Sequence, residues 1–380
     1  SSAASDVYKR QANWELLKAV LLIDATTSWN AYLTDELRVL SGKYSRALSG
    51  TPQAMDKKKA AFYLAQGPYN QALGLWYAGE KFSPEAKADV EAKVATMIDV
   101  YKSRLQTADW LAPETREKAI TKLNVITPHI GYPEKLPETY DKKIIDENLS
   151  LVENAQKLVE ISIAHSWSKW NKPVDRSEWH MPAHMVNAYY DPQQNQIVFP
   201  AAILQAPFYD IAQSSSANYG GIGAVIAHEI SHAFDTNGAS FDENGSLKNW
   251  WTEDDYAAFK ERTDKIVDQF EGLDSYGAKV NGKLTVSENV ADLGGVACAL
   301  EAAKRDEDFS VREFFINFAT IWRTKAREEY MQMLASVDVH APAKWRTNVI
   351  VTNFDEFHKE FDVKEGDGMW RAPEDRVIIW

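Results

Sequence analysis

The stretch Ala224-Val225-Ile226-Ala227-His228-Glu229-Ile230-Ser231-His232 places the pattern His-Glu-x-x-His inside an apolar run with helical periodicity. Residues four apart share one face of a helix, so the imidazoles of His228 and His232 can converge on one metal ion, and Glu229 can reach a water on that ion. With 8 His in 380 residues and Glu taken at about 7%, chance supplies roughly 0.01 such matches per chain. The stretch therefore predicts a helix that carries part of a metal site, with a purely structural helix as the alternative.

A third ligand is expected from a later segment, because a catalytic zinc ion takes three protein ligands and keeps one position open. No His-Gly pair follows the first pattern closely, since the chain continues Ala233-Phe234-Asp235-Thr236-Asn237-Gly238. Farther on, Glu288 and Asp292 are four residues apart in Ser287-Glu288-Asn289-Val290-Ala291-Asp292. We predict Glu288 as the ligand, with Asp292 and Asp235 as acceptors that fix the outer nitrogens of the two histidines.

A closed, structural zinc site is the competing interpretation, and it would need a fourth protein ligand. His180 and His184 could be proposed for that place, but neither lies at ligand spacing to the other ligands.

The segment Asp338-Val339-His340-Ala341-Pro342-Ala343-Lys344-Trp345-Arg346 combines further polar groups. His340 is a candidate for stabilising the oxyanion that forms when a carbonyl is hydrolysed. Arg346 could hold a substrate carbonyl or carboxylate through its fork of donors.

The order of predicted elements gives the domain organisation. Helical periodicity covers residues 8 to about 125, with breaks near residues 49–52, 79–84 and 112–113, and returns over 147–170. Two β-prone runs, 185–190 and 196–199, flank a turn-rich segment and predict a hairpin. We place a boundary near residue 160, between a helical lobe over 1–160 and a catalytic lobe over 161–380.

Taken together, these motifs resemble those of the neprilysin family, which includes neprilysin, the endothelin-converting enzymes and the bacterial oligopeptidase O group. The resemblance implies a mainly α fold with a small β-sheet (α+β): a thermolysin-like zincin lobe of the gluzincin type, and an all-helical lobe that roofs its cavity. The motifs that carry it are Asn187-Ala188-Tyr189-Tyr190, Asn218-Tyr219-Gly220-Gly221-Ile222-Gly223, His228 to Asp235, Glu288-Asn289-Val290-Ala291-Asp292-Leu293-Gly294-Gly295 and Asp338-Val339-His340-Ala341-Pro342.

By this resemblance the protein is a zinc metalloendopeptidase that hydrolyses oligopeptides and binds one zinc ion per chain. The ligands would be His228, His232 and Glu288, and Glu229 would activate the zinc-bound water.

The same resemblance implies how a peptide substrate is held. Asn187 and Ala188 would present an edge strand to the extended peptide, His340 would stabilise the oxyanion, and Arg346 would hold a carbonyl on the primed side. An apolar pocket after the scissile bond implies cleavage on the amino side of bulky hydrophobic residues. The pocket would be formed by Ile203, Phe208, Val225 and Trp322.

Composition limits the partners and the compartment. With 42 Lys+Arg against 55 Asp+Glu the net charge is −13, which disfavours nucleic acid and anionic lipid as partners. No apolar run approaches the roughly 20 residues of a transmembrane helix. The single cysteine, Cys298, excludes an internal disulfide framework and is expected to be buried. We expect a soluble bacterial relative that is periplasmic, secreted or lipoprotein-anchored, with a cytoplasmic location left open.

Family members are usually longer than this chain. We therefore expect a separate N-terminal half of the same protein as a partner that completes the catalytic lobe. The alternative function is an inactive fragment, or a peptide-binding protein, that needs this missing half for activity.

Overall fold

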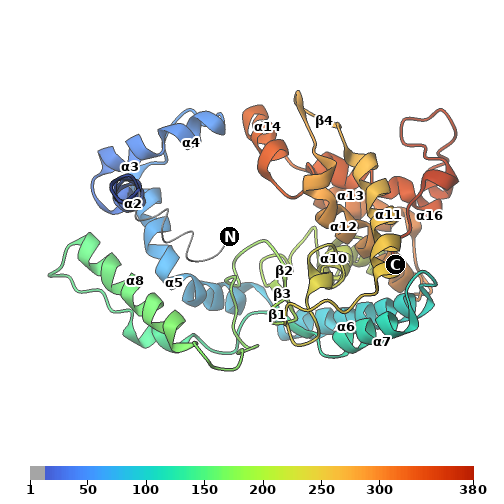
Figure 1. Ribbon diagram of the computed structural model, residues 1–380, viewed down its shortest axis with the longest axis horizontal. Coiled ribbons are helices and arrows are strands. Elements are labelled where there is room, and N and C mark those ends of the chain that lie inside the picture. The colour runs from blue at the N-terminus through green and yellow to red at the C-terminus, as the bar shows by residue number, and fades with distance from the viewer. Residues whose placement is uncertain (1–12) are drawn as a thin grey trace. The chain divides into compact units, whose positions relative to one another are not determined.

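The computed structural model describes residues 13–380, which fold into two compact units (Figure 1). The first unit contains residues 13–69 and Pro137–Pro173, and the second contains Asn70–Leu136 and Val174–Trp380. This division differs from the boundary expected near residue 160, because residues 70–136 contribute two long helices and a strand to the second unit. The helical lobe predicted over residues 1–160, and its function as a roof, remain predictions, and residues 1–12 lie outside the described residues.

Helices dominate both units, as the predicted mainly α class requires. The α-helices are α2 (Trp14–Trp29), α3 (Asp35–Ser41), α4 (Lys43–Leu48), α5 (Lys57–Lys81), α6 (Pro84–Thr107), α7 (Pro113–Asn124), α8 (Leu151–Ser168), α9 (Ser215–Asn218), α10 (Ala224–Ser231), α11 (Glu253–Phe270), α12 (Gly282–Ala303), α13 (Val311–Ile321), α14 (Glu328–Val337), α15 (Ala343–Asn348) and α16 (Asp355–Glu360). Short helical turns are η1 (Asn30–Tyr32), η2 (Glu138–Lys142), η3 (Tyr219–Gly223), η4 (Gly238–Ser240), η5 (Val351–Asn353) and η6 (Pro373–Asp375). The strands are β1 (Thr127–Gly131), β2 (Tyr189–Asp191), β3 (Gln196–Pro200), β4 (Asp274–Ser275) and β5 (Ala278–Lys279).

The first unit has little buried surface of its own. Among its described residues only Asn154 and Ala155, both on α8, are buried. Helix α8 begins with a capping box, in which Ser150 Oγ accepts from the Glu153 N–H at 3.2 Å and Glu153 Oε2 accepts from the Ser150 N–H at 2.8 Å. In the described part of the chain, no helix combines the length and the apolarity that a bilayer span requires.

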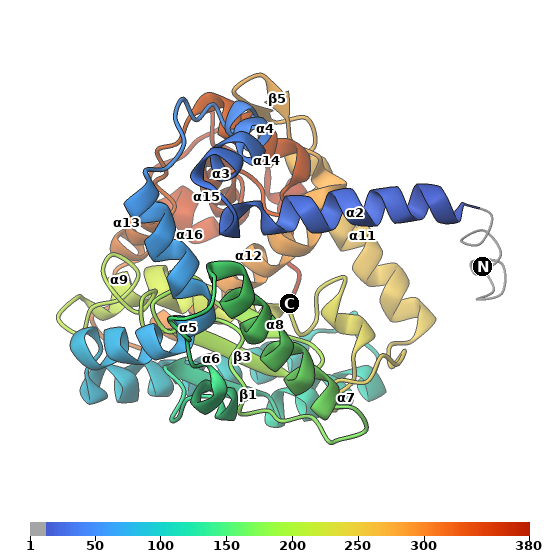
Figure 2. The ribbon, with the colours of Figure 1, turned by 90° about the vertical axis from the view of Figure 1, so that its left-hand side faces the viewer.

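The second unit contains a three-stranded sheet beside helix α6 (Figure 2). The strand order is β1-β3-β2, with β1 parallel and β2 antiparallel to β3. The predicted hairpin is confirmed as β2 and β3, but its first strand begins at Tyr189 rather than at residue 185. Strand β1 was not predicted, because its pairing partner lies far away in the sequence.

Two helices begin at the breaks expected near residues 79–84 and 112–113. Pro84 and Pro113 are the first residues of α6 and α7, where the missing N–H of proline leaves no hydrogen bond unmade. Helix α6 is buried along one face, which contacts α10 and α12. Cys298 on α12 is fully buried, as expected, and burial raises the pKa of its thiol.

Candidate metal centre

A continuous helical segment leads into the metal-binding pattern. Helix α9, the π-helical turn η3 and helix α10 follow one another without a break from Ser215 to Ser231. Gly220 lies so close to helix α13 that an added Cβ would be 2.1 Å from the Phe314 carbonyl oxygen, so only glycine fits there. All eight residues of α10 are buried, and His232 follows as its C-cap in a helical conformation. The segment therefore holds both histidines on one rigid backbone.

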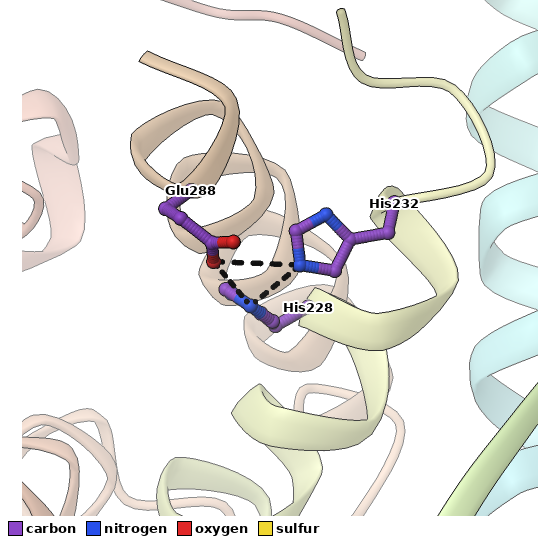
Figure 3. A group of neighbouring side chains, drawn as sticks. All are labelled: His228, His232 and Glu288. Atoms are coloured by element: carbon purple, nitrogen blue, oxygen red, sulfur yellow. Dashed lines mark hydrogen bonds and ion pairs between the residues drawn. The ribbon is translucent and has the colours of Figure 1, made fainter. Parts of the chain in front are cut away.

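His228, His232 and Glu288 converge at one point (Figure 3). Their ligand atoms all lie within 4.8 Å of one another. The Nε2 atoms of the two histidines are 3.0 Å apart, and Oε2 of Glu288 lies 3.3 Å from His228 Nε2 and 3.4 Å from His232 Nε2. Helix α10 with its C-cap supplies both histidines, and helix α12 supplies the carboxylate.

This geometry fits a zinc ion. With metal–ligand bonds of about 2.0–2.1 Å, two ligands of a tetrahedral zinc ion are about 3.3 Å apart, close to the three observed separations. In addition, Oε2 of Glu288 is buried without a hydrogen-bond partner of acceptable geometry, which a native structure seldom tolerates. The donor set of two imidazoles and one carboxylate is also one that zinc prefers.

A carboxylate contacts Nδ1 of each histidine, on the side of the ring away from the ligand position. Asp292 Oδ1 lies 2.8 Å from Nδ1 of His228, and Asp235 Oδ2 lies 2.6 Å from Nδ1 of His232. In the sequence, Asp292 and Asp235 were expected to accept from the outer nitrogens of the two histidines, and these are the atoms that they contact. With the proton on Nδ1 and donated to the carboxylate, Nε2 of each ring presents its lone pair to the ligand position.

Arg346 is buried against Asp292 and not free in the cavity. Its Nε donates to Asp292 Oδ2 and its Nη2 to Asp292 Oδ1, each at 2.7 Å. Burial raises the pKa of Asp292, but the Arg346 guanidinium outweighs this effect and lowers the pKa to about 2. The guanidinium also lies 3.8 Å from the ring centre of Trp322. This ion pair was not predicted from the sequence, because the two residues are 54 positions apart.

His340 lies next to the same carboxylate that would bind the metal. Its Nε2 is 3.2 Å from Glu288 Oε2, and its side chain is 43% exposed. Its Nδ1 is 2.9 Å from Asp338 Oδ1, a contact that holds the ring in place. The role of Asp338 was missed, although the Asp-x-His spacing was visible in the sequence.

One cavity of about 600 Å³ contains the predicted site. Its lining includes His228, Glu229, His232, Asp235, Glu288, Asp292, His340, Arg346, Asn187, Ala188, Ile203, Phe208, Val225 and Trp322. The structure thus brings the residues predicted for catalysis, metal binding and substrate binding to one cavity, whereas His180 and His184 do not line it. It adds an apolar wall from α14, which consists of Tyr330, Met331 and Leu334.

The predicted edge strand needs a correction. Asn187 and Ala188 precede strand β2, which begins at Tyr189, and they are not part of it. The Ala188 N–H donates to the Asn187 side-chain oxygen at 3.0 Å, so this N–H makes a local contact instead of a ladder bond. Strand β2 itself lies at the edge of the sheet.

The alternative of a four-ligand structural site finds no support in the geometry. Within residues 13–380, the group that could hold a metal consists of His228, His232 and Glu288. His180 instead contacts Gln194 and Asp191.

Comparison with known families gives matches at both ends of the chain. Two family models, each described as Peptidase family M13, match residues 2–133 and residues 187–377. Because both match this one chain, the expected separate N-terminal half is not supported.

Curated proteins with similar sequences include bacterial metallopeptidases. The chain is 76% identical over 312 residues to the putative zinc metalloproteinase in the scaA 5' region of Streptococcus gordonii, a match that covers 82% of this chain and 55% of that protein. It is 51% identical over 370 residues to a neutral endopeptidase of Lactococcus lactis subsp. lactis, which covers 97% of this chain and 59% of that protein. The chain thus spans less than two thirds of the length of these relatives.

Solved structures agree with these matches. The crystal structure of PepO from Lactobacillus rhamnosis HN001 aligns with a TM-score of 0.89 at 42% identity, covering 93% of this chain and 56% of that one. The structure of the Mycobacterium tuberculosis zinc metalloprotease Zmp1 in complex with an inhibitor aligns with a TM-score of 0.86 at 37% identity, covering 93% of this chain and 56% of that one.

Proposed function

We propose that this chain, which belongs to peptidase family M13, the neprilysin family, carries the catalytic centre of a zinc endopeptidase that hydrolyses oligopeptides. The observation that carries the proposal is the convergence of His228, His232 and Glu288 within 4.8 Å, in a cavity that Glu229 also lines. The names of the relatives, neutral endopeptidase among them, support the same activity.

Glu229 is proposed as the general base. A zinc ion held by the three ligands would supply Lewis acidity and lower the pKa of a water molecule beside it. Glu229 follows the first histidine on α10 and is 6% exposed. Burial raises the pKa of its carboxyl, which makes the carboxylate a better proton acceptor near neutral pH. It would take the proton from the attacking water and deliver it to the leaving amine.

His340 is proposed to stabilise the negative charge on the substrate oxygen. Its Nδ1 lies 2.9 Å from Asp338 Oδ1, and the ring lines the same cavity as Glu229. From this position its Nε2 could donate a hydrogen bond to a developing oxyanion.

The remaining cavity residues are proposed to position the peptide. Arg346 keeps guanidinium donors beyond the two that Asp292 uses, and these can bind a substrate carbonyl on the primed side. Asn187 and Ala188 lie at the cavity before the edge strand β2, where an extended peptide can add. The apolar pocket would select a bulky side chain after the scissile bond, and it consists of Ile203, Phe208, Val225 and Trp322.

The test combines zinc analysis with peptide hydrolysis. Two quenched oligopeptides would be compared, identical except for Leu or Asp directly after the scissile bond. We expect one zinc per chain and cleavage of the Leu peptide that a chelator abolishes and added zinc restores. Zinc binding without cleavage of either peptide would contradict catalysis and favour the alternative of a peptide-binding or inactive chain.

Glu229→Gln tests the mechanism within the same assay. An amide cannot accept the proton, so we expect turnover to fall by about 10²- to 10⁴-fold while zinc content stays at one. Glu253→Gln, at an exposed Glu in the first turn of α11, is the matched control and should keep full turnover. Full turnover in Glu229→Gln would refute the assignment of the base.

A further inference from the structure

Lys122 on α7 is a buried cation that the proposed chemistry does not use. It is 1% exposed, although a lysine is seldom buried without partners. Its Nζ donates to three backbone carbonyls: Ala233 at 2.8 Å, Gly238 at 2.8 Å and Phe241 at 2.7 Å. All three acceptors belong to the loop that directly follows His232.

The three acceptors match the protonated form of the side chain. An ammonium group has three N–H donors, whereas a neutral amine has two and would turn its lone pair towards the third carbonyl. Burial lowers the pKa of Lys122 to about 7. The carboxylates of Asp235, Asp242 and Glu243 oppose this effect. The rings of Tyr190, Phe234 and Trp250 each have their centres 5.8 Å from Nζ, within the range of cation–π attraction.

The loop over residues 233–241 contains the carboxylate that orients a metal ligand. Asp235 Oδ2 lies 2.6 Å from Nδ1 of His232 and also accepts from Ser287 Oγ at 2.6 Å. Asp235 Oδ1 accepts from the N–H groups of Asn237 and Gly238 at 2.8 and 2.7 Å. Gly238 therefore connects Lys122 to Asp235, because its N–H donates to Asp235 and its carbonyl accepts from Lys122.

Gly238 also shows how tightly this loop is packed. An added Cβ there would be 1.8 Å from the His232 carbonyl oxygen. A shift of Gly238 would therefore displace both the backbone of His232 and the carboxylate of Asp235.

We propose that Lys122 is a positioning residue for the metal centre: its ammonium group holds the loop 233–241 so that Asp235 keeps the His232 ring aimed at the ligand position. This inference rests on the proposed zinc site and adds a residue 110 positions before His232 in the chain. Without the ammonium group, each of the three carbonyls loses a hydrogen bond. The Gly238 carbonyl still accepts from the Phe241 N–H and the Phe241 carbonyl from Trp250 Nε1, so the cost falls mainly on the buried Ala233 carbonyl, which directly follows His232.

Zinc affinity, measured by competition with a chromophoric chelator, tests the proposal independently of turnover. Lys122→Met keeps a long side chain without donors, and we expect it to weaken zinc binding by about 10-fold, the lower end of the effect of losing a direct outer partner of a ligand, because Lys122 acts through the loop and Asp235. Leu123→Ala is the matched control, because Leu123 is its neighbour on α7 and is 2% exposed. The control should lower stability and leave zinc affinity within about 2-fold, since it removes no contact of this network.

A second measurement separates positioning from general stability. In the zinc-free protein labelled with ¹⁵N-histidine, Lys122→Met should shift the His232 Nδ1 resonance, and Leu123→Ala should not. If Lys122→Met does not fold, Lys122→Gln, which keeps two donors, is measured in the same way with the same expected direction.

The outcomes distinguish this inference from the proposed function. Wild-type zinc affinity and an unchanged His232 resonance in the folded Lys122 variant would overturn the positioning role. Failure of the wild-type chain to bind zinc would instead contradict the proposed zinc site itself.

Discussion

At the scale of single residues, Asp292 contacts two side chains from different segments, His228 and Arg346. It is 3% exposed and contacts His228 Nδ1 through Oδ1 at 2.8 Å. Both of its oxygens also accept from Arg346, which is 8% exposed. Asp292 therefore contacts a proposed metal ligand and neutralises a buried guanidinium at the same time.

Asp292→Ala should damage both metal binding and stability. Loss of the histidine contact should weaken zinc affinity by about 10- to 100-fold, and the unpaired Arg346 should reduce the free energy of unfolding by about 3–5 kcal/mol. Chelator competition and urea unfolding measure the two effects.

A surface ion pair provides the control for this prediction. Lys260 and Asp264 are paired with side chains 72% and 59% exposed, so Asp264→Ala should cost under about 1 kcal/mol. An Asp292→Ala protein that behaved like Asp264→Ala in both measurements would contradict the assigned role.

At the scale of elements, the close approach of α10 and α12 sets the ligand geometry. Gly295 on α12 faces the backbone of α10, where an added Cβ would be 2.7 Å from the His228 nitrogen and 3.0 Å from the Ala224 carbonyl oxygen. Backbone atoms within a helix cannot move aside separately, so any side chain here forces the two helices apart. The Gly294-Gly295 pair that follows the Glu-x-x-x-Asp pattern therefore has a packing function.

Gly295→Ala should lower the free energy of unfolding by about 1–3 kcal/mol through overpacking, and it should also weaken zinc binding by moving Glu288 away from the histidines. Gly79→Ala in α5 is the matched control, because no atom lies within 4 Å of its added Cβ. Removing glycine from a helix there should raise stability by about 0.5–1 kcal/mol. Equal unfolding midpoints for the two variants in urea would disprove the packing argument.

At the scale of the whole molecule, every ligand of the proposed metal belongs to the second unit. The ion would join α12 to α10 and its C-cap, so its removal should loosen those elements first. By mass action, free zinc at 100 times its dissociation constant stabilises the folded chain by about 2.7 kcal/mol.

Hydrogen exchange with and without chelator measures where this stabilisation acts. Zinc removal should increase exchange in α10 and α12 and leave α8 of the first unit unchanged, because α8 contributes no ligand. An equal increase over α8 would contradict a metal confined to the second unit.

The elements that could be predicted are those with local signals. The breaks near residues 79–84 and 112–113, after which α6 and α7 begin at a proline, the hairpin of β2 and β3, and the helix around His228 all follow from patterns within a few residues. Strand β1 was missed because its parallel pairing joins Thr127 to Gln196, and such a pairing leaves no pattern within either segment.

The sequence by itself predicted that His228 and His232 lie on one face of a helix, because the helical repeat brings residues four apart together. Only the tertiary structure decided that Arg346 pairs with Asp292 and that Lys122 holds the loop behind His232. In the sequence, Lys122 is an ordinary charged residue of a polar helix. Its burial depends on carbonyls more than 100 residues away in the chain, and folding alone brings such groups into hydrogen-bonding distance.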